Sequence, residues 1–139
     1  MTLIVLAVLV HFTGTLPYRD YRRLLQVSAA HVYLTYPYVL SWSVLEAMAC
    51  GCVVIGSDTA PVREVIRHGE NGLLVDFFDH ASLGETLLMV LDRQEDFASL
   101  RENARNSALE SYSAEHGTMA YRRLIAGNPS SRQIMRNKL

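Results

Sequence analysis

Cysteine is scarce in this sequence, and the two that occur, Cys50 and Cys52, are separated by one glycine. That spacing gives neither the CxxC of a redox site nor the thiolate pair of a zinc site. The scarcity also excludes a disulfide scaffold, and we interpret both thiols as small core residues in a reducing, cytoplasmic protein. Because the five histidines share no ligand spacing, we predict no metal and no cofactor; they are His11, His31, His68, His80 and His116.

An excess of basic charge is also missing. The 139 residues have a formal net charge of −1. Because Arg132, Arg136 and Lys138 contribute +3 near the C-terminus with no acid beside them, residues 1–131 carry −4. Binding to a phosphate backbone usually needs a basic face, so we do not expect nucleic acid as a partner.

No hydrophobic run is long enough to cross a bilayer. The segment MTLIVLAVLV at residues 1–10 is too short, follows no basic residue and lacks a small-residue cleavage site. We interpret it as part of a buried strand over residues 3–12, with a membrane-surface anchor as the alternative. We therefore predict no integral membrane segment.

Apolar runs typical of buried strands alternate with helical patterns along the chain. Strands that are apolar on both faces and separated by helices predict an α/β fold, a parallel sheet covered on both sides, followed by C-terminal helices. The predicted strands are residues 3–12, 31–35, 52–56 and 72–77. The predicted helices are residues 20–27, 43–50, 61–66, 81–93, 95–112 and 115–125.

Glycine and proline mark the ends of these elements. Gly51 stands where a left-handed residue would stop the helix over residues 43–50, and Asn71 with Gly72 predicts a tight turn. The run GNPSS at residues 127–131 ends the last helix. We assign residues 1–126 to one domain and residues 127–139 to a flexible basic tail.

The most informative stretch is YLTYPYVLSWSVLEAMACGCVVIGSD at residues 33–58. A helix that follows a parallel strand offers unpaired N–H groups and a positive dipole end, which suits a diphosphate. Glu46, one turn into this helix, could accept hydrogen bonds from ribose hydroxyls, and the combination points to a nucleotide. The alternative is a capping box, in which Ser43 caps the helix and Glu46 reaches back to its amide.

Four segments resemble the donor-binding half of retaining GT-B glycosyltransferases, the glycosyl transferase group 1 family. They are HFTGTLPY at 11–18, LLQVSAAHVYLTYP at 24–37, LEAMACGCVVIGSD at 45–58 and REVIRHGENGLLVDFFD at 63–79. The resemblance implies a Rossmann-like sheet, half of a GT-B C-terminal domain. It also implies that a nucleotide diphosphate sugar is the substrate, bound without a metal at the carboxyl ends of the strands.

The family motif assigns roles to four residues at the helix start. Glu46 would bind the ribose hydroxyls, and backbone amides around Ser41, Trp42 and Ser43 would face the diphosphate. Trp42 has an alternative role as a packing anchor, since a lone tryptophan beside an apolar helix often serves that purpose.

The remaining assignments concern the sugar and the base. Tyr38 stands eight residues before Glu46, where the family has the first of two glutamates, which contacts the donor sugar. Leu40 begins the LSWS segment that replaces the family's glycine-rich turn. Thr15 and Leu16 would lie near the base.

Family members are longer, with an N-terminal acceptor domain and further strands before the HFTG segment. The resemblance therefore implies a fragment that does not catalyse transfer alone. We expect its exposed sheet edge to be covered by a homodimer contact, by a rearranged N-terminal strand or by a separate N-terminal domain.

Of two other classes of function, the first stays open. A truncated Rossmann-like module could have a structural or partner-binding role, with Glu46 acting only as a helix cap. A dehydrogenase or a response regulator is disfavoured, because no GxGxxG follows the first strand and no acidic cluster marks a phosphoacceptor pocket.

Overall fold

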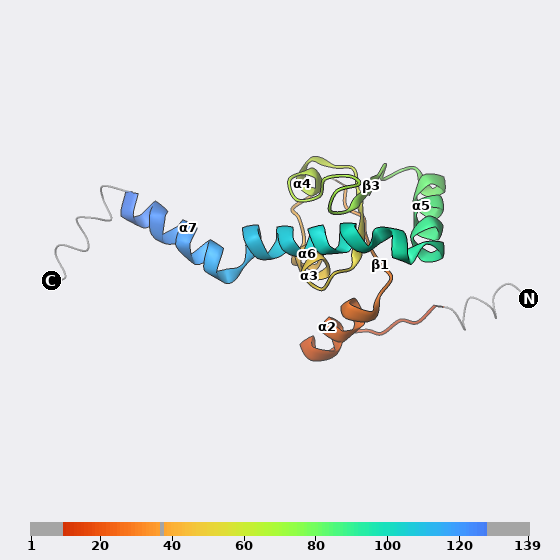
Figure 1. The fold of residues 1–139 in the computed structure, drawn as a ribbon, viewed down its shortest axis with the longest axis horizontal. Coiled ribbons are helices and arrows are strands. Elements are labelled where there is room, and N and C mark those ends of the chain that lie inside the picture. Colours follow the sequence, from red (N-terminus) through yellow and green to blue (C-terminus); the bar gives the residue numbers. More distant parts are fainter. Residues whose placement is uncertain (1–9, 37, 128–139) are drawn as a thin grey trace, which may run out of the picture.

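The computed structural model describes residues 10–36 and 38–127, which form a small parallel sheet covered by helices (Figure 1). The elements up to and including the central strand are α2 (Tyr18–Val27), β1 (Ala30–Tyr33), α3 (Trp42–Ala49) and β2 (Val53–Ser57). Those that follow are α4 (Ala60–Arg63), β3 (Leu73–Val75), α5 (His80–Asp92), the short 3₁₀ helix η1 (Gln94–Phe97), α6 (Ala98–Tyr112) and α7 (Ala114–Gly127).

The sheet has the order β1-β2-β3, and both strand pairs are parallel. In the register, Val54 lies opposite His31, and Ile55 lies opposite Leu73. Parallel neighbours need crossover connections, and the chain supplies one helix or more between each pair of strands. The predicted α/β fold with C-terminal helices is therefore confirmed.

The central strand β2 separates two hydrophobic clusters. All five of its residues are buried, and successive side chains point to opposite faces. Val54 packs with α3, α4 and α6, in a cluster that includes Val44 and Met48. Val53 and Ile55 pack on the other face with β3 and α5, in a cluster that includes Val90. Both faces of the sheet centre are thus covered, as the apolar strand pattern predicts.

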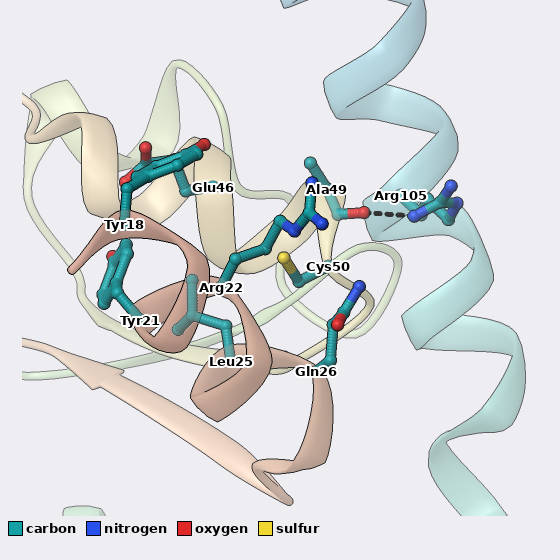
Figure 2. A pocket seen from close by; sticks show the side chains of 9 residues that line it. All are labelled: Tyr18, Tyr21, Arg22, Leu25, Gln26, Glu46, Ala49, Cys50 and Arg105. Carbon is teal, nitrogen blue, oxygen red and sulfur yellow. Dashed lines mark hydrogen bonds between the residues drawn. The ribbon is translucent and has the colours of Figure 1, made fainter. Parts of the chain in front are cut away.

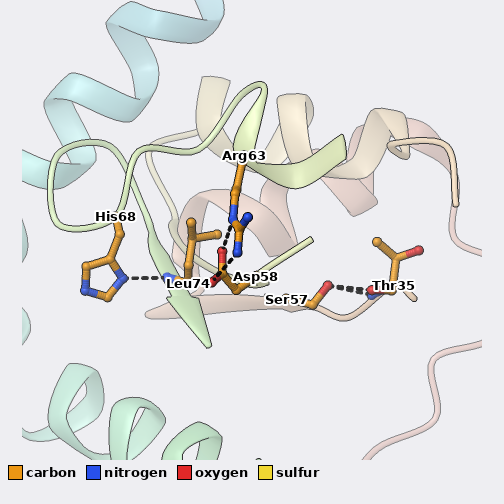
Figure 3. A network of polar contacts seen from close by, with 6 residues as sticks. All are labelled: Thr35, Ser57, Asp58, Arg63, His68 and Leu74. Atoms are coloured by element: carbon orange, nitrogen blue, oxygen red, sulfur yellow. Dashed lines mark hydrogen bonds and ion pairs between the residues drawn. The ribbon is translucent and has the colours of Figure 1, made fainter. Parts of the chain in front are cut away.

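The two edges of the sheet differ. On the β3 edge, the Leu74 amide donates to Nδ1 of His68 at 3.0 Å, so a side chain satisfies a donor that has no neighbouring strand (Figure 3). Within the described residues, β1 pairs with β2 alone. The edge strand β1 is also only partly buried. An edge that is unpaired within the described part of the chain is what the predicted dimer or domain contact requires.

The long helix α6 crosses the sheet beside α3 and fixes the C-terminal end of α3 (Figure 1). The last carbonyls of a helix have no partner within the helix. Arg105 donates to the Ala49 carbonyl at the end of α3, and Arg101 donates to the Ala29 carbonyl at 3.0 Å. Two arginines from one helix thus satisfy backbone acceptors at the end of α3 and just before β1. Beyond α6, α7 extends away from the body with no buried residue.

Several predicted boundaries are wrong. Residues 10–12 of the predicted first strand are not a strand, and residues 1–9 lie outside the described part of the chain. The helix predicted over residues 61–66 ends at Arg63. Strands β1 and β3 are shorter than predicted, and β2 is shifted by one residue toward the C-terminus. Helix α7 includes Gly127, which the sequence assigned to the tail, and residues 128–139 are not described. Gly51 has the predicted left-handed conformation, with a φ of 78°.

The predicted turn at Asn71 and Gly72 lies slightly earlier, over residues 69–71, and His68 bridges Gly72. Gly72 is needed for packing, because a Cβ there would lie 2.7 Å from Cγ2 of Ile66 and 3.2 Å from the Val54 carbonyl oxygen. Asn71 is fully buried. Its amide group accepts from the Arg67 N–H at 2.7 Å and donates to the Val65 carbonyl at 3.1 Å. A further bond reaches Ser107 of α6 at 3.1 Å and ties the turn to that helix.

Replacing Asn71 with alanine should therefore lower the free energy of unfolding by about 3 kcal/mol, because buried donors and acceptors lose their partners. Urea denaturation measures this change. Asn103→Ala is the matched control, since its side chain makes one exposed bond, to the Glu70 carbonyl, and should cost less than about 1 kcal/mol. Equal losses in the two variants would show that the Asn71 network does not hold the turn.

Candidate functional site

The N-terminus of α3 is capped by Ser41. The Ser41 side chain accepts from the Ser43 amide at 3.3 Å, and the Ser41 carbonyl accepts from the Val44 amide at 3.2 Å. The Ser41 amide itself donates to the Tyr33 hydroxyl at 3.0 Å. The amides of Ser41, Trp42 and Ser43 are those predicted to face the diphosphate. Within the described residues, only the Trp42 amide makes no hydrogen bond.

The capping-box alternative for Glu46 is wrong, because Ser41 and not Ser43 caps the helix. Ser43 does not cap the helix because its own amide donates to the Ser41 hydroxyl, which is the cap. The Ser43 hydroxyl also donates to Ser41, at 3.1 Å. Glu46 is half-buried on the side of α3 that faces α2. Its carboxylate is therefore directed toward a cleft and not toward the helix start.

The cleft lies between α2, α3 and α6 and has a volume of about 260 Å³ (Figure 2). Figure 2 shows the Tyr18 ring next to Glu46, and Arg22 extending across the opening toward Cys50. The residues that line it are Tyr18, Tyr21, Arg22, Leu25, Gln26, Glu46, Ala49, Cys50 and Arg105. One wall is thus acidic and aromatic, and the other is basic.

Charges in the cleft act on its titratable groups. Burial raises the pKa of the Tyr21 phenol, and the Glu46 carboxylate raises it further. Burial also raises the pKa of Cys50, while Arg22 and Arg105 act in the opposite direction. The tyrosine therefore stays a neutral hydroxyl at physiological pH, able to donate a hydrogen bond or accept one.

The other predicted site residues do not line this cleft. Thr15 is exposed and Leu16 half-buried in the loop before α2, and Leu40 packs against the core. Tyr38 is 75% exposed, and Trp42 is 76% exposed, which excludes the predicted packing-anchor role for the tryptophan. Glu46 is thus the one predicted residue that the structure places in the cleft.

Sequence reasoning missed the residues around Glu46. Tyr18, Tyr21, Arg22 and Leu25 recur at helical spacing on one face of α2, and that periodicity could have identified a shared surface. Arg105 is 59 positions from Glu46 in the sequence, and no local pattern could have identified it.

Two observations bear on metals and membranes. Across residues 10–36 and 38–127, no group of three or more histidine, cysteine, aspartate or glutamate side chains is placed to hold a metal ion. In the same part of the chain, no helix has both the length and the apolar character that a membrane crossing needs.

The parallel sheet, with helices on both faces and a cleft beside the second half of α3, is an α/β architecture of the Rossmann-like type. The family model for glycosyl transferases group 1 matches residues 6–107, and the chain belongs to that family. The family resemblance seen in the sequence is therefore confirmed.

Known proteins similar to this chain include enzymes that are much longer. N-acetyl-alpha-D-glucosaminyl L-malate synthase of Bacillus anthracis is 35% identical over 71 residues, which are 51% of this chain and 19% of the enzyme. Sucrose-phosphate synthase from Thermosynechococcus elongatus has a TM-score of 0.67 at 27% identity, over 85% of this chain and 31% of that one. Anabaena HepE in complex with UDP-glucose has a TM-score of 0.62 at 19% identity, over 71% and 28%.

The two cysteines should differ in reactivity. Cys52 is fully buried and its Sγ donates to the Leu25 carbonyl, and burial raises its pKa to about 11. Because the thiolate is the nucleophile, only about one Cys52 in a thousand is reactive near pH 8. Iodoacetamide should therefore label Cys50, which lines the cleft, well before Cys52, as followed by peptide mass spectrometry. Labelling of both thiols at one rate in the folded protein would contradict this environment.

Proposed function

We propose that this chain supplies the donor-binding half-site of a group 1 glycosyltransferase and that its ligand is a nucleotide diphosphate sugar. One observation carries the proposal: Glu46, within the family segment LEAMACGCVVIGSD, is half-buried in a cleft with two tyrosines and two arginines. A carboxylate in such a place accepts hydrogen bonds from a vicinal diol, and the ribose of a nucleotide provides one.

The ligand would lie along the start of α3. Glu46 would hold the ribose hydroxyls, and Tyr18 offers an exposed ring for the base. The diphosphate would extend toward Trp42, whose amide makes no hydrogen bond to the described residues and lies at the positive end of the helix dipole. Arg22 would supply compensating positive charge from the cleft wall.

Two findings support a nucleotide sugar over other nucleotides. The chain belongs to a family of glycosyl transferases, and HepE, which shares the fold, has been solved with UDP and with UDP-glucose. We propose that no metal takes part. Thr15, Leu16, Tyr38 and Leu40 remain candidate contacts to the base and the sugar.

Transfer itself would need more than this half-site. The chain spans 19% to 31% of the length of the three proteins compared above. Retaining transfer needs an acceptor held opposite the donor, so we propose that this chain binds the donor and that a further domain or a partner chain holds the acceptor. The edge of β1, which has no second partner strand among residues 10–36 and 38–127, is the place where additional strands would join the sheet.

One observation favours a second candidate function, a non-catalytic module. The amides of Ser41 and Ser43 are already hydrogen-bonded within the chain, which leaves the helix start less available to phosphate than an uncapped one. A structural or partner-binding role would need no ligand there.

Glu46→Gln distinguishes the two candidates. If Glu46 binds the ribose, losing its charge should weaken UDP binding about tenfold or more and leave the melting temperature nearly unchanged. Isothermal titration measures the affinity. Trp42, the only tryptophan of the sequence, reports independently by its fluorescence, because it stands at the first position of α3.

Glu102→Gln on the exposed side of α6 is the matched control and should leave UDP binding unchanged. The wild-type chain should also be titrated with GDP and ADP to name the base. No binding of any nucleotide to the wild type, with Glu46→Gln lowering only the stability, would favour the non-catalytic module.

A further inference from the structure

Three aromatic rings meet at the carboxyl end of the sheet. Tyr36 follows β1, and Phe77 and Phe78 follow β3. The Tyr36 ring centroid lies 5.4 Å from that of Phe77 and 5.0 Å from that of Phe78, and the two phenylalanine centroids are 5.0 Å apart. Each ring therefore contacts both others, and we call the three residues the aromatic triad.

The triad keeps much of its surface in water. Tyr36 is 61% exposed and Phe78 is 64% exposed, while Phe77 is half-buried. The rings meet edge to face or tilted, at 42° to 83°, so they do not cover one another's faces as a parallel stack would. Single exposed apolar side chains are common on protein surfaces, whereas rings that contact one another form a contiguous apolar patch that a ligand can cover.

Polar contacts hold the phenylalanine side of the triad. The Phe78 amide donates to Oδ1 of Asp76 at 2.7 Å. One residue later, Asp79 caps α5 by accepting from the Ser82 amide at 2.9 Å. Phe77 and Phe78 thus stand between the end of a strand and the fixed start of a helix.

The tyrosine side is held as well. Next to Tyr36, the Thr35 amide donates to the Ser57 hydroxyl at 3.0 Å, and that hydroxyl donates to the Thr35 carbonyl at 2.7 Å (Figure 3). Ser57 is the buried last residue of β2. A ligand would therefore meet rings that are already in position, with little ordering cost.

Carboxylates stand at the same end of the sheet. Asp76 follows β3 directly, and the Asp58 amide donates to the Val75 carbonyl at 2.7 Å, which puts both acids at neighbouring strand ends. Arg63 binds Asp58 in a bidentate pair at 2.5 and 2.8 Å (Figure 3). Carboxylate oxygens with a guanidinium beside them suit a ligand that carries many hydroxyl groups.

We propose that the aromatic triad is a saccharide-binding platform that takes a pyranose ring. The C–H bonds of a sugar ring carry partial positive charge and stack on the negative face of an aromatic ring, and the sugar hydroxyls reach the neighbouring carboxylates. This platform shares no residue with the Glu46 cleft and does not depend on nucleotide binding there. The ring that it takes could belong to a free glycan or to the sugar of a nucleotide donor.

Methyl β-D-glucopyranoside is the probe, because its equatorial hydroxyls leave C–H bonds on both ring faces. Titration followed by ¹H–¹⁵N NMR should show millimolar binding, with shifts at the Phe77 and Phe78 amides. Phe78→Ala should weaken binding about fivefold or more, and Phe78→Trp should retain it. Tyr121→Ala, which removes a 70% exposed ring on α7, is the control and should change nothing.

UDP and UDP-glucose distinguish the two sources of the sugar. If the platform holds the donor sugar, Phe78→Ala weakens UDP-glucose and not UDP; if it holds a free glycan, both nucleotides bind as before. Glu46→Gln should leave the glucoside affinity unchanged, so failure of the donor site is separable from failure of the platform. No glucoside binding by the wild type overturns the proposal. So does equal binding by Phe78→Ala, or a dimer that Phe78→Ala dissociates without any sugar effect.

Discussion

Burial of β2 is the constraint on which the rest of this structure depends. All five residues of the strand are inaccessible to solvent, and each fully buried valine or isoleucine contributes about 1.5–3 kcal/mol relative to an exposed one. Because the strand presents one cluster to α3 and α6 and the other to α5, both layers of helices are anchored to it. Its last residue, Ser57, also fixes the chain after β1. Hydrogen bonds from β2 therefore hold the carboxyl end of the sheet in place, which is where ligands bind in open α/β folds.

The cleft depends on the same core through α3. One side of this helix is in the core through Val44, Ala47 and Met48, so Glu46 is left on the side that faces α2. Arg105 reaches from α6 to the last turn of α3 and at the same time forms the basic wall of the cleft. One arginine thus serves both the helix end and the electrostatics of the candidate site. A substitution of Arg105 would therefore affect both the end of α3 and the charge of the cleft.

The elements that were predictable from sequence are those with a strong local pattern. The run at residues 52–56 predicts β2 because it is apolar throughout, and Gly51 predicts the end of α3 because few other residues adopt a left-handed backbone there. The alternative with Ser43 as the cap is wrong because Ser41 and Ser43 are equally good candidates by composition, and the Tyr33 hydroxyl that fixes Ser41 lies in the preceding strand, outside the helix pattern. The same limit applies to the cleft wall and the aromatic triad, since Arg105 and Phe78 reach their partners only through the sheet topology. Local periodicity predicts which face of a helix or strand is buried. A site formed between elements can be identified only from the three-dimensional packing of those elements.

The capped start of α3 sets the terms on which a phosphate could bind. A serine cap contributes about 1 kcal/mol to helix stability, and a diphosphate that displaced it would first lose that contribution. Charge-assisted bonds from backbone amides to phosphate are stronger than the neutral bond that the cap makes, so the exchange can still favour the ligand. The Trp42 amide needs no exchange at all. Donor binding here would therefore begin at Trp42 and Glu46 and extend to Ser43 only as the cap opens, which would make affinity at this site weaker than at an uncapped helix start of the same geometry.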